Sequence, residues 1–283
     1  MSTDLRRARL ETGAVLEMER LDGGLIELTA RLPHLAAETR PGEFAQLRCS
    51  TGFSPLLRRP FSVAWTEGDT CAFVFEVVGA GTALLAQLAP GDDLDVLGPL
   101  GSGYTLEVPP GRVLCISGGL GCAPFPILAA ALRRRGVEDI IVLNGAATAS
   151  RLYPAARFQR GDDGIRVIEA TDDGTRGHRG FVTQLVAETL TSGTAAVFAC
   201  GPNSMLVSLA RLLMATAEAP AIGEASLEAP MGCGFGTCLG CALPVLASGR
   251  DRAWALCCSD GPVMAMRDVD WNGIEALPEP SVA

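Results

Sequence analysis

The first part of the chain, up to about residue 107, consists of short apolar stretches separated by turn residues. Helical periodicity appears there only briefly, at residues 82–88. Many short strands punctuated by glycine and proline are typical of a small β-barrel or a β-sandwich. The predicted strands lie at residues 25–32, 44–50, 61–65 and 71–79.

After residue 109 apolar strands alternate with stretches of helix length, which is typical of a doubly wound, Rossmann-like parallel sheet. The longest uncharged run, 113–132, has the length of a membrane span. Glycines and prolines in its middle instead favour a strand, a turn and a helix. The predicted strands are 113–117, 139–145, 165–171 and 195–201, and the predicted helices are 124–136, 181–190 and 203–217.

From about residue 221 the chain is rich in cysteine and glycine, with brief predicted strands at 242–247 and 254–258. Such a segment is too small to fold without a covalent or metal staple. We therefore expect three parts. They are a β-barrel domain at 1–108, a Rossmann-like α/β domain at 109–220 and a small cysteine-rich subdomain at 221–283.

Composition and charge narrow the range of functions. The chain has 283 residues and a formal net charge of −9, which argues against nucleic acid as a partner. Its N-terminus is charged and has no apolar segment like that of a signal peptide. We expect a cytoplasmic protein that binds no membrane. In that compartment its ten cysteines are not expected to form disulfides, and clustered thiols more often bind metal or do redox chemistry. Most of the scattered cysteines, at 49, 71, 115, 122 and 200, read as small core residues.

Three cysteines are crowded into residues 231–241, with the spacing Cys233-x4-Cys238-x2-Cys241. This is the plant-type ferredoxin spacing for a [2Fe-2S] cluster. Four glycines in the same stretch let the backbone pass close to a cluster. Zinc is the alternative, but it favours pairs of cysteines two residues apart, and only Cys238 and Cys241 form such a pair.

The fourth ligand is either Cys257 or Cys258. If residues 254–258 form a strand, these two side chains point to opposite faces and only one can bind the cluster. A turn, Ser-Asp-Gly-Pro, follows Cys258 directly and favours that residue, because ligands often lie at the tips of turns.

Two stretches of the barrel region suggest a flavin. Arg59 and Ser62 lie in an Arg-Pro-Phe-Ser sequence at a strand, where a guanidinium and a hydroxyl could hold a phosphate and the edge of a flavin ring. Gly81 and Thr82 lie at a strand-to-helix turn, where free N–H groups bind anions.

A glycine-rich turn at 118–124 follows the first strand of the Rossmann-like region, in the position that binds dinucleotides. Proline replaces the third glycine of the usual fingerprint, and no acidic residue ends the second strand, so NADH and NADPH both remain open. A second turn, at 200–202, ends a later strand where a nicotinamide would lie. A plain strand-to-helix turn is the alternative at 200–202. The expected nucleotide-binding residues are Gly118, Gly119, Gly121, Pro124, Cys200, Gly201 and Pro202.

This order of features resembles the ferredoxin–NADP reductase superfamily, and more closely the electron transfer subunits of class 1B dihydroorotate dehydrogenase. The similarity covers nearly the whole chain, and its most specific pieces are residues 97–104, 171–183, 200–206, 226–241 and 257–263. The resemblance implies FAD, one [2Fe-2S] cluster and NAD(H) as substrate. It places the flavin at Arg59, Pro60, Phe61, Ser62, Val74, Phe75, Glu76, Gly81 and Thr82, and the cluster at Cys233, Cys238, Cys241 and Cys258.

The resemblance further implies that electrons pass between NADH, FAD and the cluster to an FMN-containing dihydroorotate dehydrogenase catalytic subunit, in a heterotetramer of two copies of each chain. The sequence contains no convincing acid–base or nucleophile set, and His34 and His178 are its only histidines. Three features depart from the family pattern: Glu76, the Cys257–Cys258 doublet and Met264. They leave open the alternative of a related subunit in a different redox complex. A redox sensor or a zinc-stapled binding module is the rival from another class.

Overall fold

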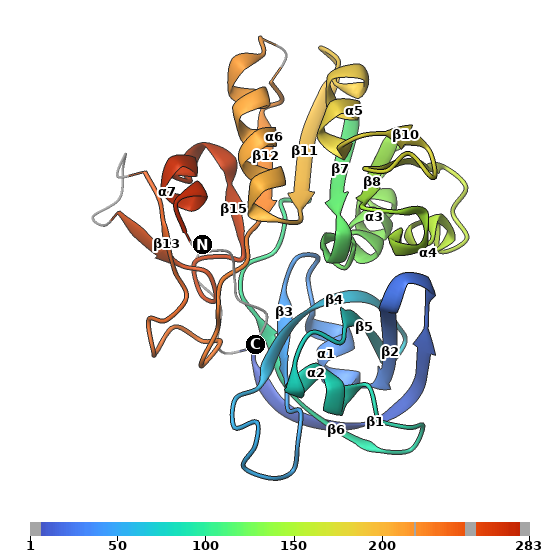
Figure 1. Cartoon of the computed structure of the whole chain (residues 1–283), viewed down its shortest axis with the longest axis vertical. Helices are drawn as coiled ribbons and strands as arrows, with labels where there is room; N and C mark the ends of the chain where they lie inside the picture. Colours follow the sequence, from blue (N-terminus) through green and yellow to red (C-terminus); the bar gives the residue numbers. More distant parts are fainter. Residues whose placement is uncertain (1–6, 218, 247–252, 278–283) are drawn as a thin grey trace.

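Six antiparallel strands close into a barrel in the order β1-β2-β5-β4-β3-β6, shown in blue and cyan in Figure 1. The computed structural model describes residues 7–217, 219–246 and 253–277. Alternate strand residues such as Leu28, Val63 and Phe73 fill the interior of the barrel. The strands are β1 (Arg9–Arg20), β2 (Leu25–Arg31), β3 (Phe44–Leu47), β4 (Arg59–Glu67), β5 (Thr70–Glu76) and β6 (Asp93–Leu100), with helices η1 (Asp22–Gly24), α1 (Pro33–Glu38) and α2 (Ala80–Leu85).

The Rossmann-like part is built on a seven-stranded sheet with the strand order β10-β9-β8-β7-β11-β12-β15. Its strands are parallel except β15, which runs antiparallel to β12. The strands are β7 (Arg112–Gly118), β8 (Ile140–Ala146), β9 (Ile165–Thr171), β10 (His178–Arg179), β11 (Thr194–Cys200), β12 (Ile222–Ser226) and β15 (Val263–Ala265). The sequence therefore predicts both the barrel and the parallel sheet correctly.

Helices cover both faces of this sheet. Leu114 and Ile116 of β7 pack with α5 (Val182–Thr189) and α6 (Asn203–Ala215), whereas Val113 and Cys115 pack with α3 (Phe125–Arg134) on the other face. This alternation is the reason the strand is apolar throughout. The remaining helices of this part are η2 (Gly119–Cys122), η3 (Ala149–Arg151) and α4 (Ala155–Gln159).

The C-terminal segment is drawn in orange and red in Figure 1 and returns to the edge of the sheet through β12 and β15. Between them lies a two-stranded sheet of β13 (Ala242–Pro244) and β14 (Trp254–Leu256), and η4 (Met266–Asp268) and α7 (Trp271–Glu275) follow. The strand predicted at 254–258 is too long, because Leu256 O accepts turn hydrogen bonds from Ser259 N (3.1 Å) and Asp260 N (2.8 Å). Residue 247, the end of the other predicted strand, lies outside the described residues.

The barrel and the Rossmann-like part are joined by a buried polar network. Glu27 of β2 is only 2% exposed. Its carboxylate accepts hydrogen bonds from Tyr153 Oη (2.7 Å), Arg157 Nη1 (2.7 Å) and Trp65 Nε1 (3.2 Å). A buried carboxylate is tolerated only when it is paired in this way, so the network fixes α4 against the barrel.

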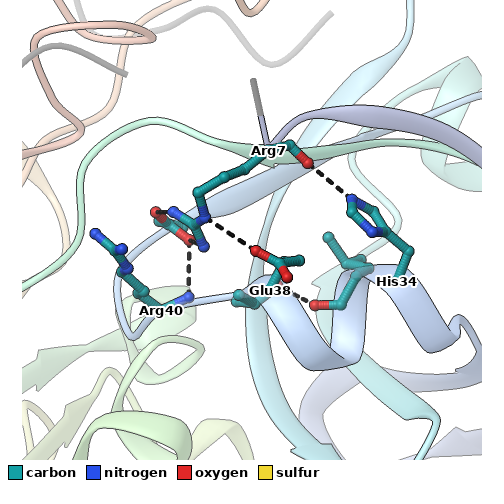
Figure 2. Close-up of polar contacts among 7 residues, drawn as sticks. Arg7, His34, Glu38 and Arg40 are labelled. Carbon is teal, nitrogen blue, oxygen red and sulfur yellow. Dashed lines mark hydrogen bonds and ion pairs between the residues drawn. The ribbon is translucent and has the colours of Figure 1, made fainter. Parts of the chain in front are cut away.

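The start of the described chain is tied to the barrel by a second network (Figure 2). Arg7 binds Glu38 (3.3 Å) and the buried Glu43 (2.8 Å), and Glu43 also accepts from Arg40 N (2.7 Å). His34 is half-buried, and its Nε2 lies 2.7 Å from Arg7 O. Within the described residues, no helix is long and apolar enough to cross a membrane.

Candidate functional site

One cavity of about 230 Å³ lies where the three parts of the chain meet. The barrel contributes Phe44 and residues of β4, β5 and α2 to its lining. The Rossmann-like part contributes Leu120, Ala123 and Cys200, and the C-terminal segment contributes residues 226–229, Met231 and Pro262. A ligand in this cavity would touch all three parts at once.

The barrel wall of the cavity contains most of the residues expected to hold a flavin. Pro60, Phe61 and Ser62 line it from β4, and Val74, Phe75 and Glu76 line it from β5. The rings of Phe61 and Phe75 pack with their centroids 5.5 Å apart, at an interplanar angle of 58°. This wall is therefore largely apolar, with a hydroxyl and a carboxylate at its edges.

The turn before α2 lies beside the same wall. Thr82 Oγ1 accepts from Val78 N (2.9 Å) and Gly79 N (3.2 Å), so its hydroxyl stabilises the turn itself. A Cβ added at Gly81 would lie 3.2 Å from Arg59 Nε, which shows that this arginine packs against the turn. Arg59 Nη1 donates to Leu57 O (2.9 Å), and neither Arg59 nor Gly81 lines the cavity.

Glu76 is the flavin-motif residue that departs from the expected pattern, and it has a specific partner. Its Oε1 lies 2.7 Å from Arg151 Nη2 of η3, across the boundary between the barrel and the Rossmann-like part. The carboxylate is thus neutralised by a guanidinium. The departure is compensated within this chain rather than left as a free negative charge beside the cavity.

The expected nucleotide loops meet at the carboxyl ends of β7 and β11. The chain leaves β7 toward β8 on one side and later returns to β11 on the other, which makes this the point where the strand order reverses. Dinucleotides bind in such a crevice. A Cβ added at Gly121 would lie 2.1 Å from Cys200 O, so only glycine permits this approach of the two loops.

The other residues of these loops surround that contact. Gly118 packs against Met205 and Pro202, and Gly119 has a φ of +55° with open space beside it. Pro124 directly precedes α3. Cys200 is buried and lines the cavity, and burial raises the pKa of its thiol.

The cysteine loop, residues 231–241, and the turn that carries Cys258 together hold two close pairs of thiols. Cys241 Sγ and Cys258 Sγ lie 3.2 Å apart, and Cys233 hydrogen-bonds with Cys238. Burial would raise the pKa of Cys233, but N–H groups of Phe235 and its neighbours outweigh it and lower that pKa to about 7. The hydrogen bond from Cys258 lowers the pKa of Cys241 to about 6. These hydrogen bonds therefore favour the thiolate forms of Cys233 and Cys241.

Cys257 and Cys258 point to different environments although both lie in a turn. Cys258 Sγ accepts from Gly236 N (3.1 Å) inside the cysteine loop. Cys257 is fully buried, and its Sγ donates to Leu227 O (3.2 Å). Burial raises the pKa of Cys257 far above its ordinary value.

The arrangement of the thiols suits two metal ions better than one. A structural zinc ion needs four ligands around a single point. In the part of the chain that the structure describes, no three cysteine, histidine or carboxylate side chains converge in that way. A [2Fe-2S] cluster needs four thiolates shared between two irons, and the pairs Cys233 with Cys238 and Cys241 with Cys258 fit that requirement.

Comparisons with known proteins agree with this geometry. Residues 228–270 match the family model described as the iron-sulfur cluster binding domain of dihydroorotate dehydrogenase B. The dihydroorotate dehydrogenase B (NAD(+)) electron transfer subunit of Desulforamulus reducens is 36% identical over 85% of this chain and 90% of its own. Its counterpart from Geobacillus thermodenitrificans is 38% identical, over 86% and 91% respectively.

The chain belongs to the family of dihydroorotate dehydrogenase B electron transfer subunits. The structure of an NADH-dependent reduced ferredoxin-NADP oxidoreductase resembles it with a TM-score of 0.80 and 28% identity, covering 93% of this chain and 91% of that one. A ferredoxin reductase of carbazole 1,9a-dioxygenase has a TM-score of 0.65 at 22% identity, over 76% of this chain and 68% of its own, and shows the shared fold alone.

The family pattern does not single out every residue that lines the cavity of this electron transfer subunit. Phe44, Leu120 and Glu228 are examples that the sequence reading did not name. The only sequence signal for Glu228 is that it lies within residues 226–241, one of the stretches that carry the family resemblance. Its side chain is exposed to the cavity, yet protein atoms surround it closely enough that desolvation raises its pKa. His34 and His178 lie outside the cavity lining.

Proposed function

We propose that this chain takes electrons from NADH and delivers them to an FMN-containing catalytic subunit that interconverts dihydroorotate and orotate. Family membership makes the chain an oxidoreductase subunit with FAD, a [2Fe-2S] cluster and NAD(H). The observation that carries the proposal is a cavity lined by the barrel, the nucleotide loops and the segment that leads into the cysteine loop.

Different stretches of this chain would bind the flavin and the nucleotide. In our proposal, residues 59–62, 74–76 and 81–82 hold FAD against the barrel, and the loops at 118–124 and 200–202 hold NADH. When bound there, FAD would supply the conversion of a two-electron hydride into single electrons, and the cluster would carry those electrons onward. The protein excludes water from the apolar wall and fixes the two loops at their glycine contact.

The proposed cluster ligands are Cys233, Cys238, Cys241 and Cys258. N–H and thiol donors around Cys233 and Cys241 favour the thiolate forms that iron needs. Cys257 is assigned to the core because its thiol faces Leu227.

The catalytic partner would dock over the cysteine loop. Cys238 is exposed there, and so are the neighbouring apolar side chains of Phe235 (39%) and Leu239 (63%). Exposed apolar residues around a redox centre suit a protein interface. We include in the proposal a heterotetramer with two copies of each chain, the domain limits 1–108, 109–220 and 221–283, and a cytoplasmic location.

The test is to co-express this chain with an FMN-containing dihydroorotate dehydrogenase subunit. We expect the two chains to purify together, with flavin absorbance and a [2Fe-2S] EPR signal that appears on reduction with NADH. Orotate reduction by NADH should require both chains. A colourless protein with bound zinc would refute the electron path. A loaded protein that binds no such partner but reduces a ferredoxin would instead support the related subunit of a different complex.

A further inference from the structure

Gln46 of β3 is a buried side chain whose polar atoms are unsatisfied. Its exposed fraction is 0%, and neither Nε2 nor Oε1 has a hydrogen-bond partner within the described residues. Leaving such a group unpaired in the interior is destabilising. A side chain of this kind is retained where something else completes its hydrogen bonds.

The cysteine loop packs directly on this amide. A Cβ added at Gly234 would lie 2.6 Å from Gln46 Nε2 and 3.0 Å from its Cδ, so the amide packs closely against Gly234. Gly234 has a φ of +84°, a conformation that favours glycine, and it directly follows Cys233. Gln46 is therefore the barrel residue that contacts the loop beside a proposed ligand.

The strand that carries Gln46 also reaches the flavin cavity. Gln46 pairs with Pro60 of β4, the strand of the flavin motif. Phe44, two residues earlier and on the same face of β3, lines the cavity. The amide thus lies between the proposed flavin wall and the proposed cluster loop.

We propose that the Gln46 side-chain amide donates a hydrogen bond to the [2Fe-2S] cluster held by this loop and raises the cluster's reduction potential. Thiolate and sulfide sulfurs are acceptors only, and the amide nitrogen is a donor that lacks a partner. A donor favours the reduced cluster, which is more negative, and hydrogen bonds to the sulfurs are among the factors that set its potential. Gln46 is thereby a positioning residue. This inference rests on the proposed cluster.

The test is a redox titration of the complete, cluster-loaded chain, followed by EPR. Gln46→Leu removes the amide at similar volume and should shift the reduction equilibrium about tenfold toward the oxidised cluster, a potential about 59 mV lower. Gln87→Leu is the matched control, because Gln87 is exposed on the same domain, and it should leave the potential unchanged. A Gln46→Leu protein with an unaltered potential would overturn the proposal.

If the Gln46→Leu protein fails to hold a cluster, a second measurement on the unaltered protein still tests the proposal. The unaltered protein, labelled with nitrogen-15 in its glutamine side chains, should show a hyperfine coupling between that nitrogen and the reduced cluster. A normal cluster signal without this coupling overturns the role of Gln46 alone. Absence of any [2Fe-2S] signal in the unaltered protein would refute the proposed function itself, so the two failures are distinguishable.

Discussion

Cys241 and Cys258 lie with their Sγ atoms 3.2 Å apart, although 17 positions separate them in the sequence. The backbone N–H of Cys258 also points to Cys241 Sγ, at 3.4 Å. The neighbouring Cys257 uses its own backbone N–H to bind Cys241 O (2.9 Å) and turns its thiol toward Leu227. The doublet therefore has one thiol for the cysteine loop and one for the core.

Serine substitutions of the doublet test this division. Cys258→Ser should abolish the [2Fe-2S] EPR signal and lower the iron content, because it removes one of four thiolates. Cys257→Ser should retain both, with some loss of stability from a hydroxyl placed in a buried thiol position. Iron analysis and EPR of the two proteins, purified in parallel, make the comparison. Loss of the cluster in Cys257→Ser but not in Cys258→Ser would reverse the assignment.

A second prediction concerns the glycine contact between the nucleotide loops. Gly121→Ala places a methyl group 2.1 Å from Cys200 O, so the two loops must move apart. These loops are the proposed NADH site, so moving them apart should weaken NADH binding. We expect KM for NADH to rise at least about tenfold. Steady-state kinetics with an artificial electron acceptor measures this without the partner subunit.

Gly193→Ala is the control for this change. Gly193 lies before β11 at the opposite end of the same sheet, and an added Cβ there meets Thr191 only at 3.8 Å, an ordinary contact. Its KM for NADH should match that of the unaltered chain. Equal KM values in both variants would show that the loop contact is not part of the nucleotide site.

The doublet also shows how far sequence reasoning reaches. The barrel, the parallel sheet and the cluster-binding segment follow from local apolar patterns and cysteine spacing, and the family and fold comparisons confirm them. A strand over 254–258 would point Cys257 and Cys258 to opposite faces, whereas β14 ends at Leu256 and both thiols lie in the turn that follows it. The face of each side chain depends on turn hydrogen bonds that a strand pattern does not describe.

Other features depend on contacts between distant parts of the chain. β15 has only three residues, too few for a periodic pattern, yet it pairs with β12 and closes the edge of the sheet. Gln46 reads as an ordinary strand residue, and its position becomes notable only when Gly234 packs on it. Such sites require the tertiary structure because no local signal marks them.

The buried network at Glu27 leads to a prediction about stability. Arg157→Ala leaves the Glu27 carboxylate, 2% exposed, without its charged partner. Breaking a buried ion pair in this way should lower the free energy of unfolding by about 3 kcal/mol. Arg211→Ala is the control, since Arg211 pairs with Glu275 on the surface and should have a much smaller effect. Urea denaturation of both variants makes the comparison, and equal losses would contradict the structural role of the network.

The last prediction concerns the pH dependence of the cysteine loop in protein from which the metal has been removed. Only a thiolate reacts with iodoacetamide, so labelling of a thiol increases as the pH rises through its pKa. The pKa of Cys233 is about 7, because N–H groups of the loop stabilise the thiolate more than burial opposes it. Labelling of Cys233 should therefore be half-maximal near pH 7, below the ordinary value for cysteine.

Burial raises the pKa of Cys71 to about 12, and this control residue should stay unlabelled. Mass spectrometry of the labelled peptides between about pH 5 and pH 9 measures both residues. A midpoint for Cys233 at or above the ordinary cysteine value would mean that the metal-free loop does not hold its N–H groups around the thiolate, and that the cluster itself organises the site.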